Sequence, residues 1–334
     1  MLAAHIRAGI MRGMKLLVTG GAGYVGSIVA SQLIEAGHEV IVLDNLSRGY
    51  QDAVPKGARF IKGEVAEVGT LFSADDSIEV VLHFAGLIAA GESVQDPELH
   101  WHNNVIGSLM LLEGMRKLNV KKLIFSSTAA VYGNPAHLPI KEDDPTVPTN
   151  PYGMTKLTID MAISSYCAAY GLAATSLRYF NVAGAYGMQG ERHEPETHII
   201  PLALAAADNH TPFYLFGDDY PTDDGTCVRD YIHVGDLARA HLLALEHLQA
   251  GKHTFYNVGS GKGFSNREVI QAVEAVTGKN LDVVLKPRRE GDPVALAASS
   301  EKAKQELGWM PEKPLLREIV GDAWKFYEGR KARA

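Results

Sequence analysis

Cysteine and long apolar runs are the two features this chain most lacks. It has only two cysteines among 334 residues, Cys167 and Cys227, which lie far apart and form no Cys-x-x-Cys pair. That spacing argues against a disulfide framework and against a zinc site, so we predict no bound metal. No apolar stretch approaches the roughly 20 residues that a membrane-spanning helix needs, which argues against a membrane partner.

An excess of positive charge is also missing. The formal net charge is −7, which argues against nucleic acid or an anionic membrane surface as the main partner. The first 13 residues contain Arg7 and Arg12 but no sustained apolar segment, so they do not resemble a secretory signal. We therefore predict that residues 1–13 form a dispensable, disordered extension and that the protein is cytoplasmic.

The chain does have a glycine-rich segment between a strand and a helix. Residues 19–26 read Thr-Gly-Gly-Ala-Gly-Tyr-Val-Gly, after an apolar run at 15–18 and before apolar residues with helical spacing. Glycines in such a turn leave room for a pyrophosphate to reach the backbone N–H groups that open the helix. Taken alone this pattern is weak, because an ordinary turn is its commoner explanation.

A second apolar run strengthens the interpretation of a nucleotide site. Residues 39–43 lead to Asp44, about twenty residues after the turn, where a carboxylate accepts the hydroxyls of the adenosine ribose. Strand, glycines, helix, strand and acidic residue in this order predict a dinucleotide site. Asp44 favours NAD over NADP because it would repel a 2′-phosphate. Arg48, four residues later, could weaken that preference.

The chain alternates strand and helix without an internal repeat. Strands are predicted near 15–19, 39–43, 58–62, 78–84, 121–126 and 174–180, mostly separated by helical segments. This alternation predicts an α/β fold with a Rossmann-like, doubly wound parallel sheet and helices on both faces. We expect an NAD-binding domain over residues 14–180 and a smaller, mixed α/β domain over 181–334, from which the chain crosses back to the first.

Beyond about residue 185 the apolar spacing loosens. The Gly- and Asp-rich stretches 187–193 and 217–225 predict long loops, which in a compact enzyme usually build the site. Short strands are expected at 213–216, 230–234 and 254–258, and helices at 235–249 and 265–277. A Ser265/Glu268 capping box opens the second of these helices, and Pro314 is expected to start a C-terminal one.

A tyrosine and a lysine one helical turn apart form the second candidate site. Asn150 is a good N-cap and Pro151 a good first helical residue, so a helix begins here with Tyr152 and Lys156 on one face. A tyrosine has a pKa near 10, but the lysine cation, the helix end and an oxidised nicotinamide would favour the phenolate. Lowering the pKa by three units requires about 4 kcal/mol. Such a pair often occurs by chance on exposed helices, but downstream of an NAD fingerprint we interpret it as catalytic.

These motifs together resemble the extended short-chain dehydrogenase/reductase family. Within it, the sequence is similar to the UDP-galactose (UDP-glucose) 4-epimerases, in segments that follow in order over nearly the whole chain after Met14. The matching segments are 83–86 (His-Phe-Ala-Gly), 91–94 (Gly-Glu-Ser-Val), 103–104 (Asn-Asn), 125–133 (Phe-Ser-Ser-Thr-Ala-Ala-Val-Tyr-Gly), 178–181 (Arg-Tyr-Phe-Asn), 184–185 (Gly-Ala), 224–233 (Asp-Gly-Thr-Cys-Val-Arg-Asp-Tyr-Ile-His) and 288–292 (Arg-Arg-Glu-Gly-Asp). The resemblance is specific for the family and less specific for the exact sugar.

The resemblance implies an isomerase that recycles its own NAD. Tyr152, as the phenolate, would take the proton of the sugar 4-hydroxyl while hydride passes from C4 to NAD. The resulting 4-keto sugar would turn over and be reduced on its other face. Lys156 would bond the nicotinamide ribose, and Thr128 would hydrogen-bond the 4-oxygen. Residues 181–334 would then mainly bind a UDP-sugar, with the nucleotide clamped and the hexose loosely held.

The resemblance also assigns binding residues by position. For NAD these are, besides Tyr152 and Lys156, Gly20, Gly23, Tyr24, Val25, Asp44, Asn45, Glu64, Val65, Phe84, Ala85, Gly86, Asn103, Ser126 and Tyr179. For the UDP-sugar they are, besides Thr128 and Tyr152, Asn181, His198, Ile199, Arg229, Tyr231, Arg289 and Asp292. The two arginines match positions where a guanidinium binds two phosphate oxygens. A homodimer is expected through helices near 101–118 and 151–169, although a core-facing apolar stripe would look identical in sequence.

Other functions on this fold stay open to different degrees. Leu296 stands where some members have a bulky Tyr and others a small residue that admits N-acetylated sugars, so an N-acetylhexosamine or uronate 4-epimerase is the closest alternative. Ile88 replaces a lysine that some members place near the cofactor. A sugar-nucleotide 4,6-dehydratase would need an acidic pair directly after Thr128, where Ala129 and Ala130 stand. A non-catalytic NAD-sensing protein would have lost the Tyr–Lys pair, which is intact.

Overall fold

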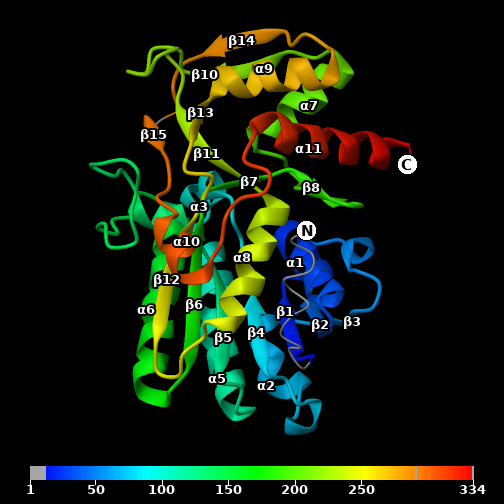
Figure 1. Ribbon diagram of the computed structural model, residues 1–334, viewed down its shortest axis with the longest axis vertical. Helices are drawn as coiled ribbons and strands as arrows, with labels where there is room; N and C mark the ends of the chain where they lie inside the picture. The colour runs from blue at the N-terminus through cyan, green and yellow to red at the C-terminus, as the bar shows by residue number, and fades with distance from the viewer. Residues whose placement is uncertain (1–12, 290–291, 333–334) are drawn as a thin grey trace.

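A seven-stranded, parallel sheet forms the centre of the molecule (Figure 1). The computed structural model describes residues 13–289 and 292–332, so the extension predicted at 1–13 lies, apart from Gly13, outside the described residues. Across the sheet the strands follow the order β12-β6-β5-β4-β1-β2-β3. Their bounds are β1 (Lys15–Thr19), β2 (Glu39–Asp44), β3 (Arg59–Lys62), β4 (Val80–His83), β5 (Lys122–Thr128), β6 (Ala173–Tyr179) and β12 (His253–Val258). The predicted fold class is confirmed.

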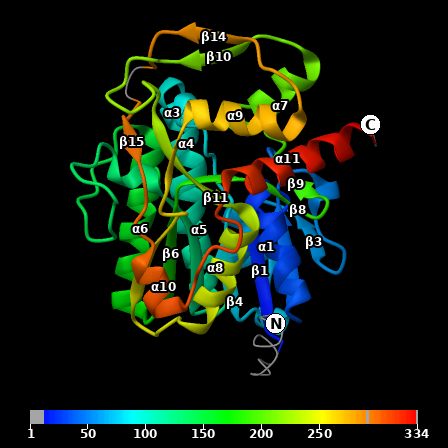
Figure 2. The ribbon, with the colours of Figure 1, turned by 45° about the horizontal axis from the view of Figure 1, so that its top comes forward.

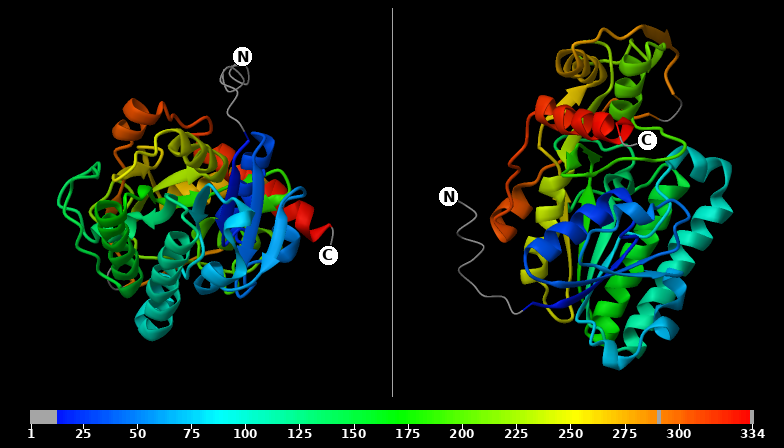
Figure 3. Two further views of the ribbon diagram at one scale, coloured as in Figure 1. Left: turned by 90° about the horizontal axis from the view of Figure 1, so that it is seen from below. Right: turned by 90° about the vertical axis from the view of Figure 1, so that its right-hand side faces the viewer.

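Helices cover both faces of this sheet (Figure 3), and an apolar core on each face holds them against it. Side chains alternate along each strand, so Leu16 and Val18 of β1 enter one core and Leu17 enters the other. The first core takes in α1 (Tyr24–Glu35), α8 (Val234–Glu246) and α10 (Glu301–Leu307). The second takes in α2 (Val68–Leu71), α5 (Gly107–Lys117) and α6 (Pro151–Tyr170). Because both faces are covered, the strands are continuous apolar runs in the sequence.

A smaller part of the molecule lies beyond the carboxyl ends of these strands (Figure 2). It contains α7 (Ile199–Asn209), α9 (Asn266–Thr277) and α11 (Leu316–Lys331), which share a third apolar core. Its strands are β7 (Asn181–Ala183), β8 (Ala185–Tyr186), β9 (Gln189–Gly190), β10 (Phe213–Phe216), β11 (Val228–His233), β13 (Gly263–Ser265), β14 (Val283–Lys286) and β15 (Ala295–Leu296). Strand β11 pairs with β7, β13 and β15, and β10 pairs with β14.

The chain passes between the two parts more than once. After β11 it returns along α8 to cover the large sheet, and β12 then pairs with β6 as the edge strand. It leaves again through β13 and α9 and comes back as α10. Residues from both halves of the sequence therefore meet at the carboxyl edge of the sheet, the edge at which open α/β sheets bind ligands.

Most predicted elements are present with small shifts. The six strands predicted in the first 180 residues correspond to β1–β6, and Asn150 caps α6 by accepting the Gly153 N–H at 2.9 Å. The Ser265/Glu268 capping box is also confirmed. The predicted start of the last helix is wrong: Leu315 has an extended backbone and serves as the N-cap, so α11 begins at Leu316. Helix α7 was not predicted. Among the described residues, no helix is long and apolar enough to cross a membrane.

Candidate active site

The glycine turn packs closely against the segment that follows β4. Gly20 has φ +72°, and a Cβ there would lie 2.5 Å from the Ala85 backbone nitrogen. A Cβ on Gly26 would lie 2.3 Å from the Gly20 carbonyl oxygen, so the start of α1 packs directly on the turn. Gly23 is the N-cap of α1 and offers no capping side chain. Tyr24 and Val25, both predicted to contact NAD, begin this helix. A bare helix N-terminus on a close-packed glycine turn fits a pyrophosphate.

Asp44 ends β2 and lies against the glycine turn. Its side chain is buried, and its carboxylate accepts the N–H of Ala22 at 3.0 Å and that of Leu46 at 2.8 Å. Burial raises the pKa of Asp44, and the two N–H groups oppose this rise. A carboxylate has about four acceptor positions, so it can still accept ribose hydroxyls. Nearby, Asn45 donates to the Glu64 carboxylate at 3.1 Å, with Val65 next in the chain.

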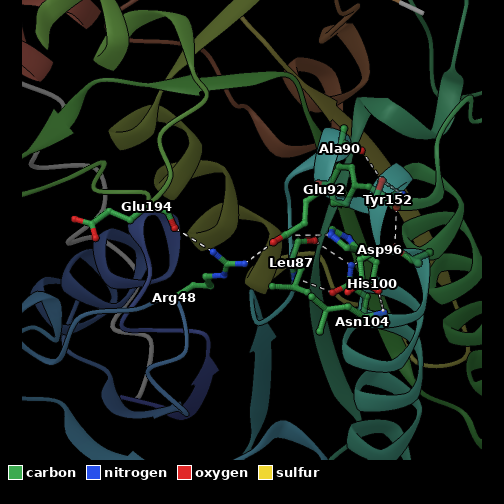
Figure 4. A network of polar contacts seen from close by, with 12 residues as sticks. Arg48, Leu87, Ala90, Glu92, Asp96, His100, Asn104, Tyr152 and Glu194 are labelled. Atoms are coloured by element: carbon green, nitrogen blue, oxygen red, sulfur yellow. Dashed lines mark hydrogen bonds and ion pairs between the residues drawn. The ribbon is translucent and has the colours of Figure 1, made fainter.

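Arg48 links the loop after β2 to two other segments (Figure 4). Its guanidinium donates to the Glu92 carboxylate at 2.6 Å and to the Glu194 carbonyl at 3.0 Å. Glu92 belongs to α3 (Ala90–Gln95), and its second oxygen lies 3.3 Å from His100 Nε2. Because Arg48 is engaged in this way, it is not a free cation for a 2′-phosphate. This arrangement is consistent with the prediction that Asp44 favours NAD.

The segment after β4, from Phe84 to Gly86, is fixed from both sides. The Ala85 N–H donates to the Thr19 carbonyl at 3.1 Å, which joins the segment to β1. On the other side, a Cβ on Gly86 would lie 3.2 Å from the Asn104 amide oxygen and 3.6 Å from the Lys156 ammonium. Glycine at this position therefore lets the strand end approach the catalytic lysine closely.

Two neighbouring asparagines lie in the π-helical turn Trp101–Ile106. Asn103, which was predicted to contact NAD, is half-buried, whereas Asn104 is fully buried. The side-chain oxygen of Asn104 accepts the Leu87 N–H at 2.8 Å. Its side-chain NH₂ group donates to the Leu87 carbonyl at 3.0 Å and to the Thr155 hydroxyl at 3.2 Å. Asn104 therefore braces the strand end against α6. Sequence reasoning missed it, although its place in a matching Asn-Asn pair was a usable signal.

Tyr152 is the second residue of α6, beside the end of β5. A side-chain hydrogen bond joins it to Thr128, whose hydroxyl also accepts the Ala130 N–H at 3.1 Å. The Tyr152 backbone N–H donates to the Ser93 hydroxyl of α3 at 3.1 Å. Ser93 thus satisfies one of the four N–H groups that a helix N-terminus leaves free and ties α3 to the catalytic helix. Ser93 lies within a matching segment, but no role was predicted for it.

Lys156 lies one turn further along α6 and is almost completely buried. Its ammonium donates to the Ser126 carbonyl at 2.8 Å and lies 4.8 Å from the centre of the Phe125 ring. Burial lowers the pKa of Lys156 to about 8, and the Asp160 carboxylate opposes that fall. The ammonium is thereby held beside Gly86 at the end of β5, where a ribose hydroxyl can reach it.

The predicted lowering of the tyrosine pKa is wrong for the protein side chains alone. Burial raises the pKa of Tyr152, and the hydrogen bond with Thr128 opposes only part of that rise. The ammonium of Lys156 donates to the Ser126 carbonyl, and burial lowers its pKa. The phenolate therefore needs a further positive charge close to the hydroxyl, which an oxidised nicotinamide would supply.

A buried ion pair supports the catalytic helix from behind. Asp160, one turn after Lys156, lies 3.4 Å from Arg178 of β6, and both side chains are almost completely buried. The carboxylate also accepts the hydroxyls of Ser127 at 3.0 Å and Ser176 at 2.7 Å. The pair fixes α6 against β5 and β6 and so determines where the lysine lies. Sequence reasoning did not single out Asp160, although an acid one turn from a catalytic lysine was a readable signal.

Ser126, two residues before the end of β5, and Tyr179, the last residue of β6, meet at the carboxyl edge of the sheet. The Tyr179 hydroxyl donates to the Ser126 hydroxyl. Burial raises the pKa of Tyr179, and the charge of the nearby Tyr152 phenolate adds to the rise. Tyr179 therefore stays a neutral donor while Tyr152 changes its protonation state. The structure thus brings together Thr128, Ser126, Tyr152, Lys156 and Tyr179.

The two predicted phosphate-binding arginines flank one loop. Arg229 extends from β11 and donates to the carbonyls of Val228 and Pro293, both at 2.9 Å, and to the Asp292 carboxylate at 3.3 Å. Arg289 is exposed, with its guanidinium 4.1 Å from the centre of the Phe216 ring. The loop joins them, because the Asp292 N–H donates to the Arg289 carbonyl at 3.3 Å. Asp292, predicted to contact uridine or ribose, pairs here with Arg229.

The remaining predicted substrate residues come from β7, β11 and the start of α7. Asn181 and Tyr231 are register partners on adjacent strands, and Tyr231 is buried. His198 is the N-cap of α7, which begins at Ile199. Burial opposes protonation of His198, but the carboxylates of Glu191 and Glu196, 2.8 and 2.9 Å away, raise its pKa to about 10.

Leu296 lies between Arg229 and the residues that follow β5. In β15 it is the register partner of Arg229. It also packs against a small apolar cluster that includes Ala129 and Val131, directly after the catalytic threonine. This position, beside Thr128 and in register with a predicted phosphate ligand, suits a residue that limits the size of the sugar.

Comparisons with known proteins agree with this geometry. Residues 16–259 match the model of the NAD dependent epimerase/dehydratase family. A UDP-glucose 4-epimerase of Corynebacterium glutamicum is 58% identical over 314 residues, covering 94% of this chain and 95% of that protein. A solved UDP-glucose 4-epimerase of Brucella ovis in complex with NAD has a TM-score of 0.89 at 42% identity, covering 94% of this chain and 98% of that one. One of Bifidobacterium longum in complex with NAD⁺ and UDP has a TM-score of 0.89 at 37% identity, covering 95% and 99%.

The predicted family, fold and cofactor are thereby confirmed, while the role of each site residue stays a prediction. Three features of the structure are consistent with bound NAD: the close packing of the glycine turn, the burial of Asp44 and the pairing of Arg48 with Glu92. The comparisons support the same cofactor. The match extends over both parts of the molecule, since the relatives are covered almost completely. The chain belongs to the NAD-dependent epimerase/dehydratase family.

Proposed function

We propose that this chain is an isomerase that interconverts UDP-glucose and UDP-galactose at C4. The observation that carries the proposal is the placement of Tyr152, Thr128 and Lys156 together at the carboxyl edge of the sheet, beside the glycine turn. The 58% identity to a UDP-glucose 4-epimerase supports the same substrate.

Tyr152 moves the proton of the sugar 4-hydroxyl. As the phenolate it accepts this proton, and it returns the proton to the 4-oxygen when the sugar is restored. Thr128, which is hydrogen-bonded to Tyr152, is placed to bond the same 4-oxygen and to keep it in line with the phenol. Tyr179 and Ser126 form a neutral pair at the same edge, so neither competes with Tyr152 as a base.

Lys156 sets the charge and orientation on the cofactor side. Bound NAD would supply the group that accepts hydride from C4 and gives it back. The Lys156 ammonium, held by the Ser126 carbonyl at 2.8 Å, is placed to bond the nicotinamide ribose. Asp44 would accept the adenosine ribose hydroxyls, and the backbone from Gly20 to Gly23 would bind the pyrophosphate.

The nucleotide part of the substrate is held by the charged groups of the smaller part. Arg229 and Arg289 would bind the diphosphate, with His198, Ile199 and Asn181 as further contacts. Tyr231 and Asp292 would contact the uridine or its ribose. The hexose meets fewer polar groups, because Ala129 and Ala130 follow Thr128 and carry no side-chain donors. A firmly held nucleotide with a loosely held sugar suits a reaction in which the sugar must turn.

A branched side chain at position 296 favours hexoses without an acetamido group. Leu296 is half-buried against the cluster of Ala129 and Val131, so an N-acetyl substituent on this side would need it to move. We therefore place UDP-glucose and UDP-galactose ahead of the N-acetylhexosamine or uronate substrates. The Ala129–Ala130 pair offers no acid to expel water and argues against a dehydratase.

We also propose a homodimer formed through α5 and α6. Helix α6 buries Ile159 and Ile163 in the core but leaves Met161 64% exposed on its other side. On the neighbouring helix, Leu109 and Met110 of α5 are also exposed. These side chains would form the apolar centre of an interface between two copies. Sedimentation velocity should give the mass of two chains for the wild type and of one chain for Met161→Glu. We further place the enzyme in the cytoplasm, which two free, buried cysteines suit.

An assay of epimerisation tests the proposed activity. Purified protein is incubated with UDP-galactose, and UDP-glucose is measured by an enzyme that oxidises only UDP-glucose. We expect UDP-glucose to form, and a separate incubation without the coupling enzyme should show no net reduction of added NAD, because an epimerase recycles its cofactor. Net NAD reduction would indicate a dehydrogenase, and a lack of any product would indicate an NAD-sensing protein. Parallel incubations with UDP-N-acetylgalactosamine and UDP-galacturonate identify the sugar.

A further inference from the structure

Four possible metal ligands gather on one short segment, and one of them, His198, is also a proposed contact to the substrate. Glu191, His193, Glu196 and His198 lie between β9 and α7, and each offers one ligand atom. These four atoms all lie within 4.8 Å of one another. The prediction of no metal rested on the spacing of the cysteines, and this cluster contains none. Two imidazoles and two carboxylates are a common donor set for a borderline divalent cation.

The contacts inside the cluster converge on a point between the four side chains. The Nδ1 atoms of His193 and His198 lie 3.0 and 2.8 Å from one oxygen of Glu191. The same His198 nitrogen lies 2.9 Å from an oxygen of Glu196. The Nδ1 atom of His198 carries at most one proton, which it can donate to Glu191 or to Glu196 but not to both. A cation at the centre would satisfy both carboxylates at once.

The cluster is held in place by contacts that do not involve its own donors. The Gln189 amide donates to the carbonyls of Ser27 at 3.1 Å and Ala53 at 2.7 Å. Arg192 pairs with Asp52 through two hydrogen bonds, at 2.8 and 2.9 Å. At its end the segment continues directly into α7. A metal site needs its ligands to be positioned in advance by such outer contacts.

We propose that Glu191, His193, Glu196 and His198 bind one divalent cation of the zinc class. Magnesium and calcium prefer sites made only of oxygen ligands, so the two imidazole nitrogens argue against these cations. Metal–ligand distances of about 2.0–2.2 Å put tetrahedral donors about 3.3–3.6 Å apart, so the contacting atoms must separate by about half an ångström. Four protein ligands leave no open position, which makes the site structural rather than catalytic.

The position of the cluster indicates what the cation stabilises. The His193 ring lies edge-on to the ring of Tyr24, with centroids 6.4 Å apart, and Tyr24 begins α1 directly after the glycine turn. The Tyr24 hydroxyl donates to the carbonyl of Gly184, the residue directly before β8, at 2.7 Å. At its other end the cluster joins the start of α7. The cation therefore fastens the β8–β9 segment between the cofactor helix and the substrate side.

Metal binding to the purified full chain tests this site. Protein freed of metal with a chelator is titrated with Co²⁺, and absorption in the visible region reports four-coordinate cobalt. We expect the band to saturate at one equivalent, Zn²⁺ to displace it, and saturating Zn²⁺ to raise Tm by a few degrees. His193→Asn should weaken Co²⁺ binding at least 100-fold. His210→Asn, on an exposed residue whose left-handed backbone Asn tolerates, should leave it unchanged.

Two results would overturn the proposal. One is wild-type protein that gives no four-coordinate cobalt spectrum and no metal-dependent rise in Tm. The other is His193→Asn binding Co²⁺ as tightly as the wild type, which would place any bound ion elsewhere. If His193→Asn does not fold, Glu191→Gln, which keeps the shape of the side chain, takes its place in the same comparison. None of these measurements uses epimerase activity, so failure of the proposed function would leave them unaffected.

Discussion

Replacing Tyr152 by Phe should abolish most catalysis while leaving the fold and the nucleotide sites intact. The phenol oxygen is the one group that the proposed mechanism asks to carry the proton. Its side-chain hydrogen bond is with Thr128, and the backbone N–H of residue 152 bonds Ser93 whatever the side chain. The substitution therefore removes the proton carrier without moving the helix that presents it.

The size of the two effects can be worked out separately. Loss of one hydrogen bond costs about 1 kcal/mol of folding stability, which for a chain of 334 residues corresponds to a shift in Tm of about 1–2 °C. Loss of a positioned acid–base group lowers the rate about 10²–10⁴-fold, or about 2.7–5.4 kcal/mol at 1.36 kcal/mol per factor of ten. Since the residues proposed to bind UDP lie elsewhere, KM should change by less than about threefold.

The assay is the conversion of UDP-galactose to UDP-glucose, with Tm measured on the same samples. Tyr170→Phe serves as the control, because Tyr170 ends the same helix and is exposed. It should retain the wild-type kcat. If Tyr152→Phe keeps kcat within tenfold of the wild type, another group moves the proton and the mechanism proposed for Tyr152 is wrong.

Three further predictions concern the support of the site. Asp160→Asn should lower the free energy of unfolding in urea by about 3–5 kcal/mol, because it leaves the Arg178 charge buried without a partner, and adding Arg178→Met should recover part of the loss. Arg48→Met should speed release of bound NAD by no more than about fivefold, measured by NAD content after dilution, because the partly exposed pair with Glu92 is worth about 0.2–1 kcal/mol. Burial and the Lys156 cation lower the pKa of His83 to about 3. The stability that neutral His83 gives the folded state is therefore fully present above about pH 6.5 and is lost as pH falls towards 3, and the loss reaches about 2 kcal/mol at pH 5. His83→Gln should reduce this pH dependence, and an unchanged slope between pH 7 and 5 would contradict it.

Features fixed by neighbouring residues could be predicted from the sequence. The glycine turn, the capping of α6 by Asn150 and the Ser265/Glu268 capping box each depend on backbone geometry within a few residues. Buried parallel strands were predicted for a similar reason, because both of their faces are covered and they appear as uninterrupted apolar runs. Such features need no knowledge of how distant segments pack.

Features that depend on distant segments could not be predicted in this way. Arg48 and Glu92 are 44 positions apart, and their ion pair exists only because the loop after β2 and α3 lie on the same side of the sheet. The pKa of Tyr152 was expected to be lowered by Lys156, by the helix end and by an oxidised nicotinamide. In the structure burial has the larger effect, and it depends on the strands and helices packed around the site.

The balance between a held nucleotide and a mobile sugar follows from where the charged side chains lie. Arg229 reaches the loop of Asp292 from β11, and Asp44 lies at the opposite end beside the glycine turn. In the proposed mode of binding the hexose would lie between them, next to Thr128, where Ala129 and Leu296, which share one apolar cluster, cannot donate or accept a hydrogen bond. A hexose bound there would give up little by turning, because each hydroxyl would lose few directed contacts. A polar side chain at either position would instead hold one face of the sugar and slow the turning of the 4-keto sugar on which inversion at C4 depends.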